Sequence, residues 1–323
     1  MLIISFYVII MLCLIAGNKT VISGASYGLM LWYNNVLPLL MPFMLVSGLI
    51  VSRINALPKK LQKKYAVIIT LFTGLLCGYP LGAKNASDFI INDAYDKSTG
   101  QLLLALVNNC SPMFLLGYII SNLLDNKITL IFALSVIYTP YIILIILKLL
   151  FYKLSSIFNF QNEEKTARTM NNNAISKKSL QDKNNSNKKT SSQNTSGNDY
   201  IMSTIIQITY VGFYIMICSI ISEYILTLKM IPEDIRIFAA SLTEITKGAR
   251  LIADKYMTSG SVTKLSNAIA LILGLTSFGG ISAILQTGNV IKDTKLSIWK
   301  YIIEKTVCGI STYGLAILLF NYL

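Results

Sequence analysis

Apolar segments of about 20 residues recur along most of this chain, and that is the length an α-helix needs to cross the hydrocarbon core of a bilayer. The segments expected to span the membrane are residues 2–17, 29–51, 65–83, 101–121, 128–152, 201–228, 266–288 and 298–322. Hydrophobic residues make up 54% of the sequence and charged residues only 13%, which is more apolar surface than a water-soluble fold of 323 residues can hide. The sequence therefore predicts an all-α, polytopic helical membrane protein. Residues 2–17 are expected to be a retained first span, because no basic region precedes them.

The positive charge of the chain lies mainly between these segments. A net charge of +13 would suggest nucleic-acid binding in a soluble protein, but this placement indicates cytoplasmic loops, and we expect no nucleic-acid partner. Residues 153–200 are low in complexity, with eight Lys and Arg against four acidic residues. They predict a disordered polar cytoplasmic linker between an N-terminal membrane half, 1–152, and a C-terminal membrane half, 201–323.

Two of the expected spans contain helix-breaking residues. The basic loop 53–64 and the linker are both expected on the cytoplasmic side, so one of the segments between them, 65–83 or 101–121, should be re-entrant or broken. The sequence GLLCGYPLGA at 74–83 also resembles GLTSFGGISA at 274–283, which suggests two related halves. Paired interruptions of this kind are typical of a transporter's binding site near the membrane midplane, and chance similarity of two membrane segments is the alternative.

Polar residues gather at these breaks. Gly78, Pro80 and Gly82 should interrupt the first helix and expose N–H groups that favour negative or electron-rich ligands, a preference that Lys84 would reinforce. Two adjacent carboxamides precede Pro112, and they must find partners in hydrocarbon. The structural alternatives are a lysine that snorkels to the interface and amides that bond only neighbouring helices. The expected substrate-binding residues are Tyr79, Lys84, Asn85, Asn108, Asn109, Ser111, Glu244, Thr246, Ser277, Ser282 and Gln286.

The second half adds a carboxylate and another break. Glu244 lies in a less apolar segment, 234–253, where it could pair with Lys247 on one helix face. An intramembrane acid is a candidate to bind ligand hydroxyls, amines or a coupling cation. If the segment is instead an interfacial amphipathic helix, this glutamate is simply solvated. Gly279 and Gly280 supply the second break.

Catalytic chemistry finds little support in the sequence. The chain has no histidine, which removes the commonest general base and metal ligand. Its five cysteines show neither CxxC nor metal-type spacing, and it has no GxxxxGK[ST] motif for direct ATP coupling. We therefore expect no enzyme activity, no cofactor and no metal site.

Four motifs, in this order and spacing, resemble the nucleoside-recognition (Gate) domain membrane proteins, and within them the YlbJ-type sporulation integral membrane proteins. The motifs are GYPLGAK at 78–84, NNCSPMFLLG at 108–117, LTEITKG at 242–248 and SFGGISAILQ at 277–286. The resemblance implies a protein with two related halves, distantly similar to concentrative nucleoside transporters, that acts in spore formation. It also implies a place in the bacterial cell membrane or in a forespore-surrounding membrane. The polar linker is longer than this family's pattern and the chain is short at its ends.

Two functions follow as hypotheses. One is a transporter or permease for a small polar or anionic solute, dipicolinate-like or nucleoside-like, bound at the two helix breaks. The other is a non-transporting membrane scaffold required for spore formation. Polar residues that converge on a cavity favour the transporter, whereas a solid packed core favours the scaffold. The lipid bilayer is the expected partner in both cases, and a coupling ion and a homo-oligomer are compatible with the first.

Overall fold

The computed structural model describes residues 15–170, 197–257 and 261–322, with only the helical backbone given for 152–170 and 197–200. The described residues are almost entirely helical, and no strand occurs among them. Within these described residues, six helical segments are long and apolar enough to cross a membrane, which confirms the all-α polytopic prediction. They are Asn18–Asn55, Lys97–Leu123, Leu130–Phe151, Ile201–Thr227, Val262–Thr294 and Ile298–Tyr322. Most of the expected first span, 2–17, lies outside the described residues.

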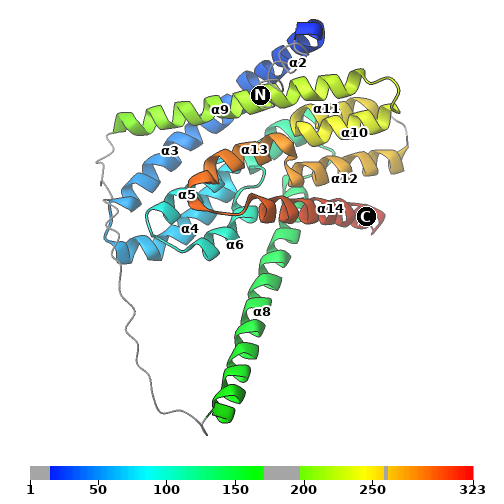
Figure 1. Ribbon diagram of the computed structural model, residues 1–323. Coiled ribbons are helices and arrows are strands. Elements are labelled where there is room, and N and C mark those ends of the chain that lie inside the picture. Colours follow the sequence, from blue (N-terminus) through cyan, green and yellow to red (C-terminus); the bar gives the residue numbers. More distant parts are fainter. Residues whose placement is uncertain (1–14, 171–196, 258–260, 323) are drawn as a thin grey trace, which may run out of the picture.

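Both halves of the chain present the same order of elements (Figure 1). The first half consists of α2 (Asn18–Leu31), the π-helical η1 (Trp32–Val36), α3 (Leu37–Asn55), α4 (Lys59–Cys77), α5 (Leu81–Ile91), α6 (Lys97–Val107), α7 (Pro112–Phe114), the π-helical η2 (Leu115–Leu123) and α8 (Leu130–Met170). The second half consists of α9 (Gly197–Thr227), α10 (Glu233–Thr243), α11 (Ile245–Tyr256), α12 (Val262–Phe278), α13 (Gly280–Ile291), the short 3₁₀ helix η3 (Lys292–Thr294) and α14 (Ile298–Tyr322). Each half is thus a long helical segment, two interrupted segments and a second long helix.

This order pairs the breaks differently from the sequence comparison. The segment 74–83 belongs to the first interrupted pair of its half, α4 and α5, whereas 274–283 belongs to the second pair of its half, α12 and α13. The counterpart of the α4–α5 break is therefore the α10–α11 break at Glu244. The short match between GLLCGYPLGA and GLTSFGGISA reflects two glycine-containing helix interruptions that do not occupy equivalent positions.

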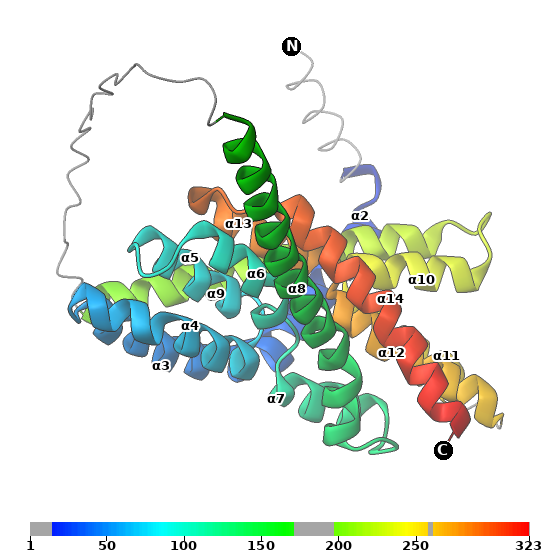
Figure 2. The ribbon, with the colours of Figure 1, turned by 90° about the horizontal axis from the view of Figure 1, so that it is seen from below.

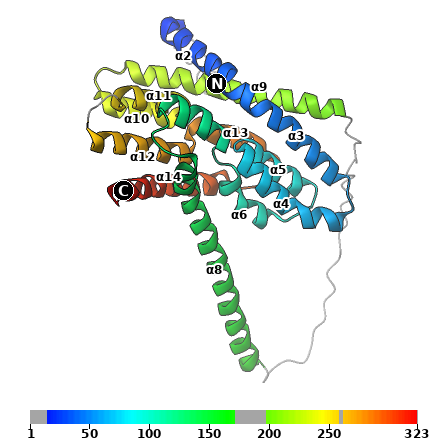
Figure 3. The same ribbon diagram turned by 180° about the vertical axis from the view of Figure 1, so that it is seen from behind.

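The first interrupted segment, α4 with α5, is a helical hairpin that turns back at Gly78 to Pro80. The Asn85 side chain donates to Thr73 Oγ1 at 2.7 Å, which joins the two arms near the tip. The Lys59 ammonium donates to the Asn92 carbonyl at 2.5 Å, which brings the far ends of the arms together. The arms lie side by side in Figure 1 and in the view from behind in Figure 3. The segment 65–83 is thus not one continuous crossing helix, which agrees with the prediction that one of the segments 65–83 and 101–121 is re-entrant or broken.

The segment 234–253 is also a hairpin and not one helix. Its arms, α10 and α11, pack so closely that a β-carbon on Gly248 would lie 2.3 Å from Ser241 Cα. At the open end, the Lys255 ammonium donates to Asp234 Oδ1 at 2.6 Å. Because the tip of this hairpin is buried, the alternative of an amphipathic helix at the interface does not hold.

The two halves pack against each other along long helices. Gly24 and Gly28 of α2 allow close approach to α9, because β-carbons there would lie 2.7 Å from Ile220 Cα and 2.8 Å from Met216 Cα. The arm α5 contacts α13, and α8 crosses α14, as the view from below shows (Figure 2). The helix α8 continues to Met170 and α9 begins at Gly197, so helices extend into the expected linker, 153–200, from both sides. The rest of that segment lies outside the described residues.

Candidate functional site

The tip of the first hairpin is held against the break of the neighbouring helix. The helix formed by α6, α7 and η2 is interrupted at 108–111, and the Tyr79 N–H donates to the Asn109 carbonyl there at 2.8 Å. Gly78 has a positive φ of 72°, and a β-carbon on it would lie 2.3 Å from the Asn109 oxygen. The Asn108 side chain accepts from the Ala83 N–H at 3.2 Å. The backbone N–H groups that the first hairpin exposes at its tip are therefore hydrogen-bonded to acceptors at the break of the neighbouring helix.

The second half repeats this contact. The α12–α13 helix breaks at Gly279, which has a φ of 90°, and Gly280 follows with a φ of 76°. A β-carbon on Gly280 would lie 3.3 Å from the Leu242 oxygen and 3.4 Å from the Ile245 nitrogen. The tip of the second hairpin, at Thr243 and Glu244, is therefore packed against the second broken helix.

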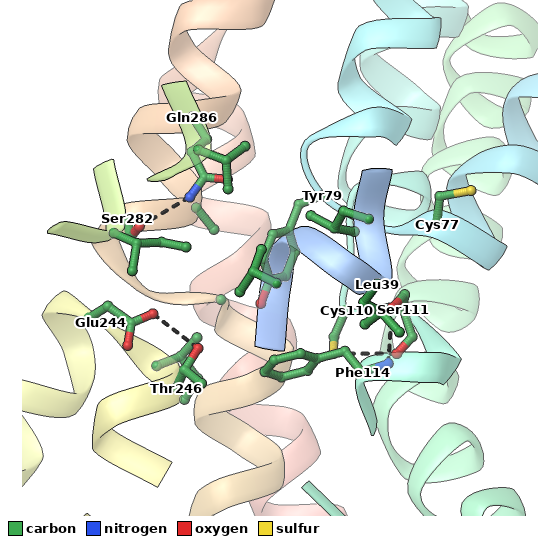
Figure 4. Close-up of a pocket in the computed structure, with 17 residues that line it drawn as sticks. Leu39, Cys77, Tyr79, Cys110, Ser111, Phe114, Glu244, Thr246, Ser282 and Gln286 are labelled. Atoms are coloured by element: carbon green, nitrogen blue, oxygen red, sulfur yellow. Dashed lines mark hydrogen bonds between the residues drawn. The ribbon is translucent and has the colours of Figure 1, made fainter. Parts of the chain in front are cut away.

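A small pocket lies where the hairpin tips and broken helices meet (Figure 4). We call it the central pocket. Its polar lining residues are Tyr79, Ser111, Glu244, Thr246, Ser282 and Gln286, six of the eleven expected from the sequence. In Figure 4, Glu244, Thr246, Ser282 and Gln286 lie on one side, Cys110 and Ser111 on the other, and Tyr79 between them. Apolar side chains of η1, α3 and α9 complete the lining, and the cavity measures about 40 Å³. That volume holds two or three water molecules.

Glu244 is the only charged residue among those that line the central pocket. It is 2% exposed and caps α11, with Oε2 accepting from the Lys247 N–H at 2.7 Å and Oε1 accepting from the Thr246 hydroxyl at 3.1 Å. A helix N-terminus stabilises a carboxylate in this position. The expected side-chain pairing of Glu244 with Lys247 is wrong, because the Lys247 ammonium instead forms an ion pair with Glu223 of α9. The chain breaks at Glu244, so the two residues do not share a helix face.

Some hydrogen-bonding capacity in the central pocket is unused. The Gln286 amide donates to Ser282 Oγ at 3.1 Å, but its Oε1 is buried without a partner. The Tyr79 hydroxyl makes no hydrogen bond to the described residues. A carboxylate accepts about four hydrogen bonds, and Glu244 receives two from its own helix turn. The pocket therefore presents acceptors and hydroxyls that a bound species can satisfy.

Two expected binding residues lie outside this pocket, within the first hairpin. Lys84 forms a salt bridge with Asp88 at 3.0 Å, one turn along α5. Asn85 donates to Ser47 Oγ at 2.9 Å as well as to Thr73. The Asn85 contacts tie α5 to α3 and α4, and the Lys84 salt bridge stays within α5, so neither residue lines the pocket.

Three more expected residues, Asn108, Asn109 and Ser277, bond the broken helices to each other and to α8 and α14. Asn108 Nδ2 donates to Thr287 Oγ1 at 2.7 Å and to the Tyr301 hydroxyl at 2.9 Å. Ser277 accepts at its carbonyl from the Tyr141 hydroxyl at 2.7 Å. Asn109 Oδ1 accepts from the Lys305 ammonium at 3.2 Å.

The partners of these residues, Thr287, Tyr301, Tyr141 and Lys305, were not foreseen from the sequence. The strongest missed signal is Lys305, a lysine inside the apolar segment 298–322, where an ionisable residue is by default a functional candidate. Among the described residues no three His, Cys, Asp or Glu side chains lie together as metal ligands, and the described cysteines are free thiols.

Fold and site together define a multi-pass helical membrane protein in which, among the described residues, two helical hairpins and two broken helices surround a polar pocket. No protein-family model, curated protein or solved structure matches the chain.

Proposed function

We propose that the protein is a membrane transporter whose solute site is the central pocket. The observation that carries this proposal is the convergence of four helix interruptions on one cavity with unmet polar groups. Broken helices at membrane depth are the usual source of solute sites in transporters with repeated halves. Hairpin tips on both sides of the cavity also provide elements that can move apart to admit a solute.

The lining chemistry favours a neutral or cationic polar solute. Glu244 and Gln286 offer oxygen acceptors, and Tyr79, Ser111 and Ser282 offer hydroxyls, whereas no lysine or arginine lines the pocket. A dianion such as dipicolinate would face a buried carboxylate without a compensating cation, which is unfavourable in low dielectric. Lys84, whose charge suggested an anion, is paired with Asp88 outside the pocket. Of the two expected solute types, the nucleoside-like one therefore fits better.

Transport by this pocket requires a conformational change. The cavity of about 40 Å³ is well below the roughly 300–1,000 Å³ typical of small-molecule sites. We expect a solute to enter when a hairpin moves relative to α3 and α9, whose side chains complete the lining. The role in spore formation and the forespore-surrounding membrane rest on the motif resemblance alone, and they form part of this proposal on that ground.

Flux into proteoliposomes tests the proposal. Radiolabelled uridine and dipicolinate should be compared in wild type, Glu244→Gln and the matched control Glu233→Gln, whose glutamate is exposed at the start of α10. Because a hydrogen bond to a charged group contributes about 1.5–3 kcal/mol, Glu244→Gln should reduce saturable uridine flux by roughly 10- to 100-fold. Glu233→Gln should keep it.

The outcomes separate the two functions. Saturable dipicolinate flux without uridine flux would reverse the solute assignment but retain a transporter. Absence of flux for both solutes in folded protein would favour the scaffold. Equal flux in Glu244→Gln and wild type would remove the central pocket from the transport path.

A further inference from the structure

Lys305 is a fully buried lysine in the first third of an apolar helix, α14. It lies seven residues into α14, about 10 Å from the start of the helix, and its side chain is 0% exposed. Its ammonium therefore does not reach an interface by snorkelling. Burial of a charge in low dielectric is costly unless the surrounding groups compensate for it.

The partners of Lys305 come from three elements. Asn109 Oδ1, in the first broken helix, accepts from the ammonium at 3.2 Å. The Tyr141 ring of α8 lies 5.0 Å from the ammonium, in the geometry of a cation–π contact. A β-carbon on Gly279, at the second break, would lie 3.8 Å from Lys305 Cε and 3.9 Å from Tyr79 Cε1. The ammonium thus sits where the breaks of the two halves meet, directly behind the central pocket.

No carboxylate of the described residues forms a salt bridge with this ammonium. The neighbouring Glu304 pairs with Lys148 at 2.7 Å, and the other buried lysine, Lys247, pairs with Glu223. Asn109 Nδ2 beside it is also buried without a partner.

An anion bound in the central pocket does not explain the arrangement, because neither Lys305 nor Asn109 is among the residues that line it. An amide oxygen, an aromatic face and interrupted helices are instead groups that bind a cation. In transporters with broken helices, unwound backbone and adjacent oxygens commonly hold a free Na⁺ or H⁺.

We propose that the Lys305 ammonium is a tethered cation that occupies the cation site between the two breaks, so that the protein needs no Na⁺ there. The covalently held charge joins the two halves at the place where a free ion would otherwise have to bind. This inference goes beyond the transport proposal. Its test measures cation binding through the unfolding temperature and does not measure flux. The cation proposal can therefore fail while the transport proposal holds, and the reverse.

The experiment compares unfolding temperatures of purified protein in detergent, at constant ionic strength, in sodium, choline, tetramethylammonium and n-propylammonium chloride. Propylammonium replaces the atoms that Lys305→Ala removes beyond Cβ. The variants are Lys305→Ala, the volume-conserving Lys305→Met, and the control Lys300→Ala, which removes an exposed lysine of the same helix.

Wild type should unfold at the same temperature in sodium and in choline. Propylammonium should raise the unfolding temperature of Lys305→Ala by about 2–4 °C, because a ligand that binds only the folded state stabilises it. Tetramethylammonium, which donates no hydrogen bond, should leave the unfolding temperature of Lys305→Ala unchanged. Lys305→Met, whose side chain fills the site, and Lys300→Ala should show no propylammonium response.

Saturable stabilisation of wild type by sodium over choline would overturn the proposal, and this measurement needs no variant. An equal propylammonium response in Lys305→Met and Lys305→Ala would also overturn it, because the response would then arise elsewhere. The proposal would also be overturned if Lys305→Ala folds but no cation raises its unfolding temperature.

Discussion

Gly78→Ala should disrupt the site, because Gly78 combines a strained backbone conformation with a close backbone contact at the edge of the central pocket. Gly78 combines a φ of 72° with a ψ of −155°, a region that side chains rarely adopt and that costs about 1–3 kcal/mol. The added β-carbon would lie 2.3 Å from the Asn109 oxygen and 2.8 Å from the Ser111 nitrogen. Both atoms are backbone, so the broken helix itself must shift, at a further cost of about 1–3 kcal/mol.

The expected destabilisation is therefore about 2–6 kcal/mol, which is a large part of the stability of a typical protein. At about 2 °C per kcal/mol for a chain of this size, the unfolding temperature in detergent should fall by roughly 4–12 °C. The matched control is Gly314→Ala in α14, where no atom lies within 4 Å of the new methyl group. That variant should be about 0.5–1 kcal/mol more stable than wild type, because alanine favours a helix interior.

Solute flux provides a second measurement on the same pair of variants. The shift at Gly78 should displace Tyr79 and Ser111, which line the central pocket, so flux should fall in protein that is still folded at the assay temperature. An unfolding temperature of Gly78→Ala within about 1 °C of wild type would refute the reasoning, since neither the strained backbone nor the close contact could then exist.

Three further changes test the surrounding structure through the unfolding temperature. Asn85→Ala should cost about 1–3 kcal/mol, because it leaves the buried Thr73 hydroxyl without its donor, and a loss below 0.5 kcal/mol would contradict the bonding of the first hairpin. Ser111→Ala should cost about 1 kcal/mol through loss of the cap that starts α7, and Ser111→Asp should retain that cap. The hydroxyls of Ser98 and then Thr99 hold the pKa of Asp96, the cap of α6, below its ordinary value of 3.8. Because the folded pKa is the lower one, this stabilisation is present above pH 4 and is lost as the pH falls through the folded pKa, so acid should destabilise wild type more than Asp96→Asn.

The sequence located three of the four breaks because glycine and proline mark them. Gly78, Pro80 and Gly279 interrupt helices by their backbone preferences, and an Asn pair before Pro112 signals an interruption in an apolar segment. These signals are local, so they remain visible without any knowledge of the tertiary structure. They were sufficient to identify four of the six polar residues that line the central pocket, Tyr79, Ser111, Ser282 and Gln286.

The break at Glu244 carries no such signal. Neither Gly nor Pro lies at 242–247, and glutamate is not among the preferred capping residues, so the segment looks like one amphipathic helix. The hairpin forms because Gly248 lets the arms pack closely and because the tip is buried against the second broken helix. Both causes are tertiary contacts, which explains why the expected pairing of Glu244 with Lys247 failed.

Lys305 illustrates a different kind of omission. Its sequence neighbours include Lys300 and Glu304, so it resembles one of several charges near the start of a membrane helix, which normally face lipid headgroups. Only the packing of α14 against the two breaks separates it from those residues, since Lys300 is exposed and Lys305 is not. A sequence places an ionisable residue at a depth in the membrane, but the direction in which it points depends on the fold.

The interruptions themselves argue for a binding role over a purely structural one. Each break frees backbone N–H and C=O groups, and such groups are costly in a membrane unless they are bonded. Much of that cost is offset within the protein, because Tyr79 bonds to Asn109 and Asn108 bonds to Ala83. A scaffold that used breaks only for close packing would have no reason to leave further polar groups unmet at the same point. Here a carboxylate with spare acceptor capacity, an unpartnered amide oxygen of Gln286 and the Tyr79 hydroxyl all remain, and a hydrated solute or ion is the simplest species that satisfies them.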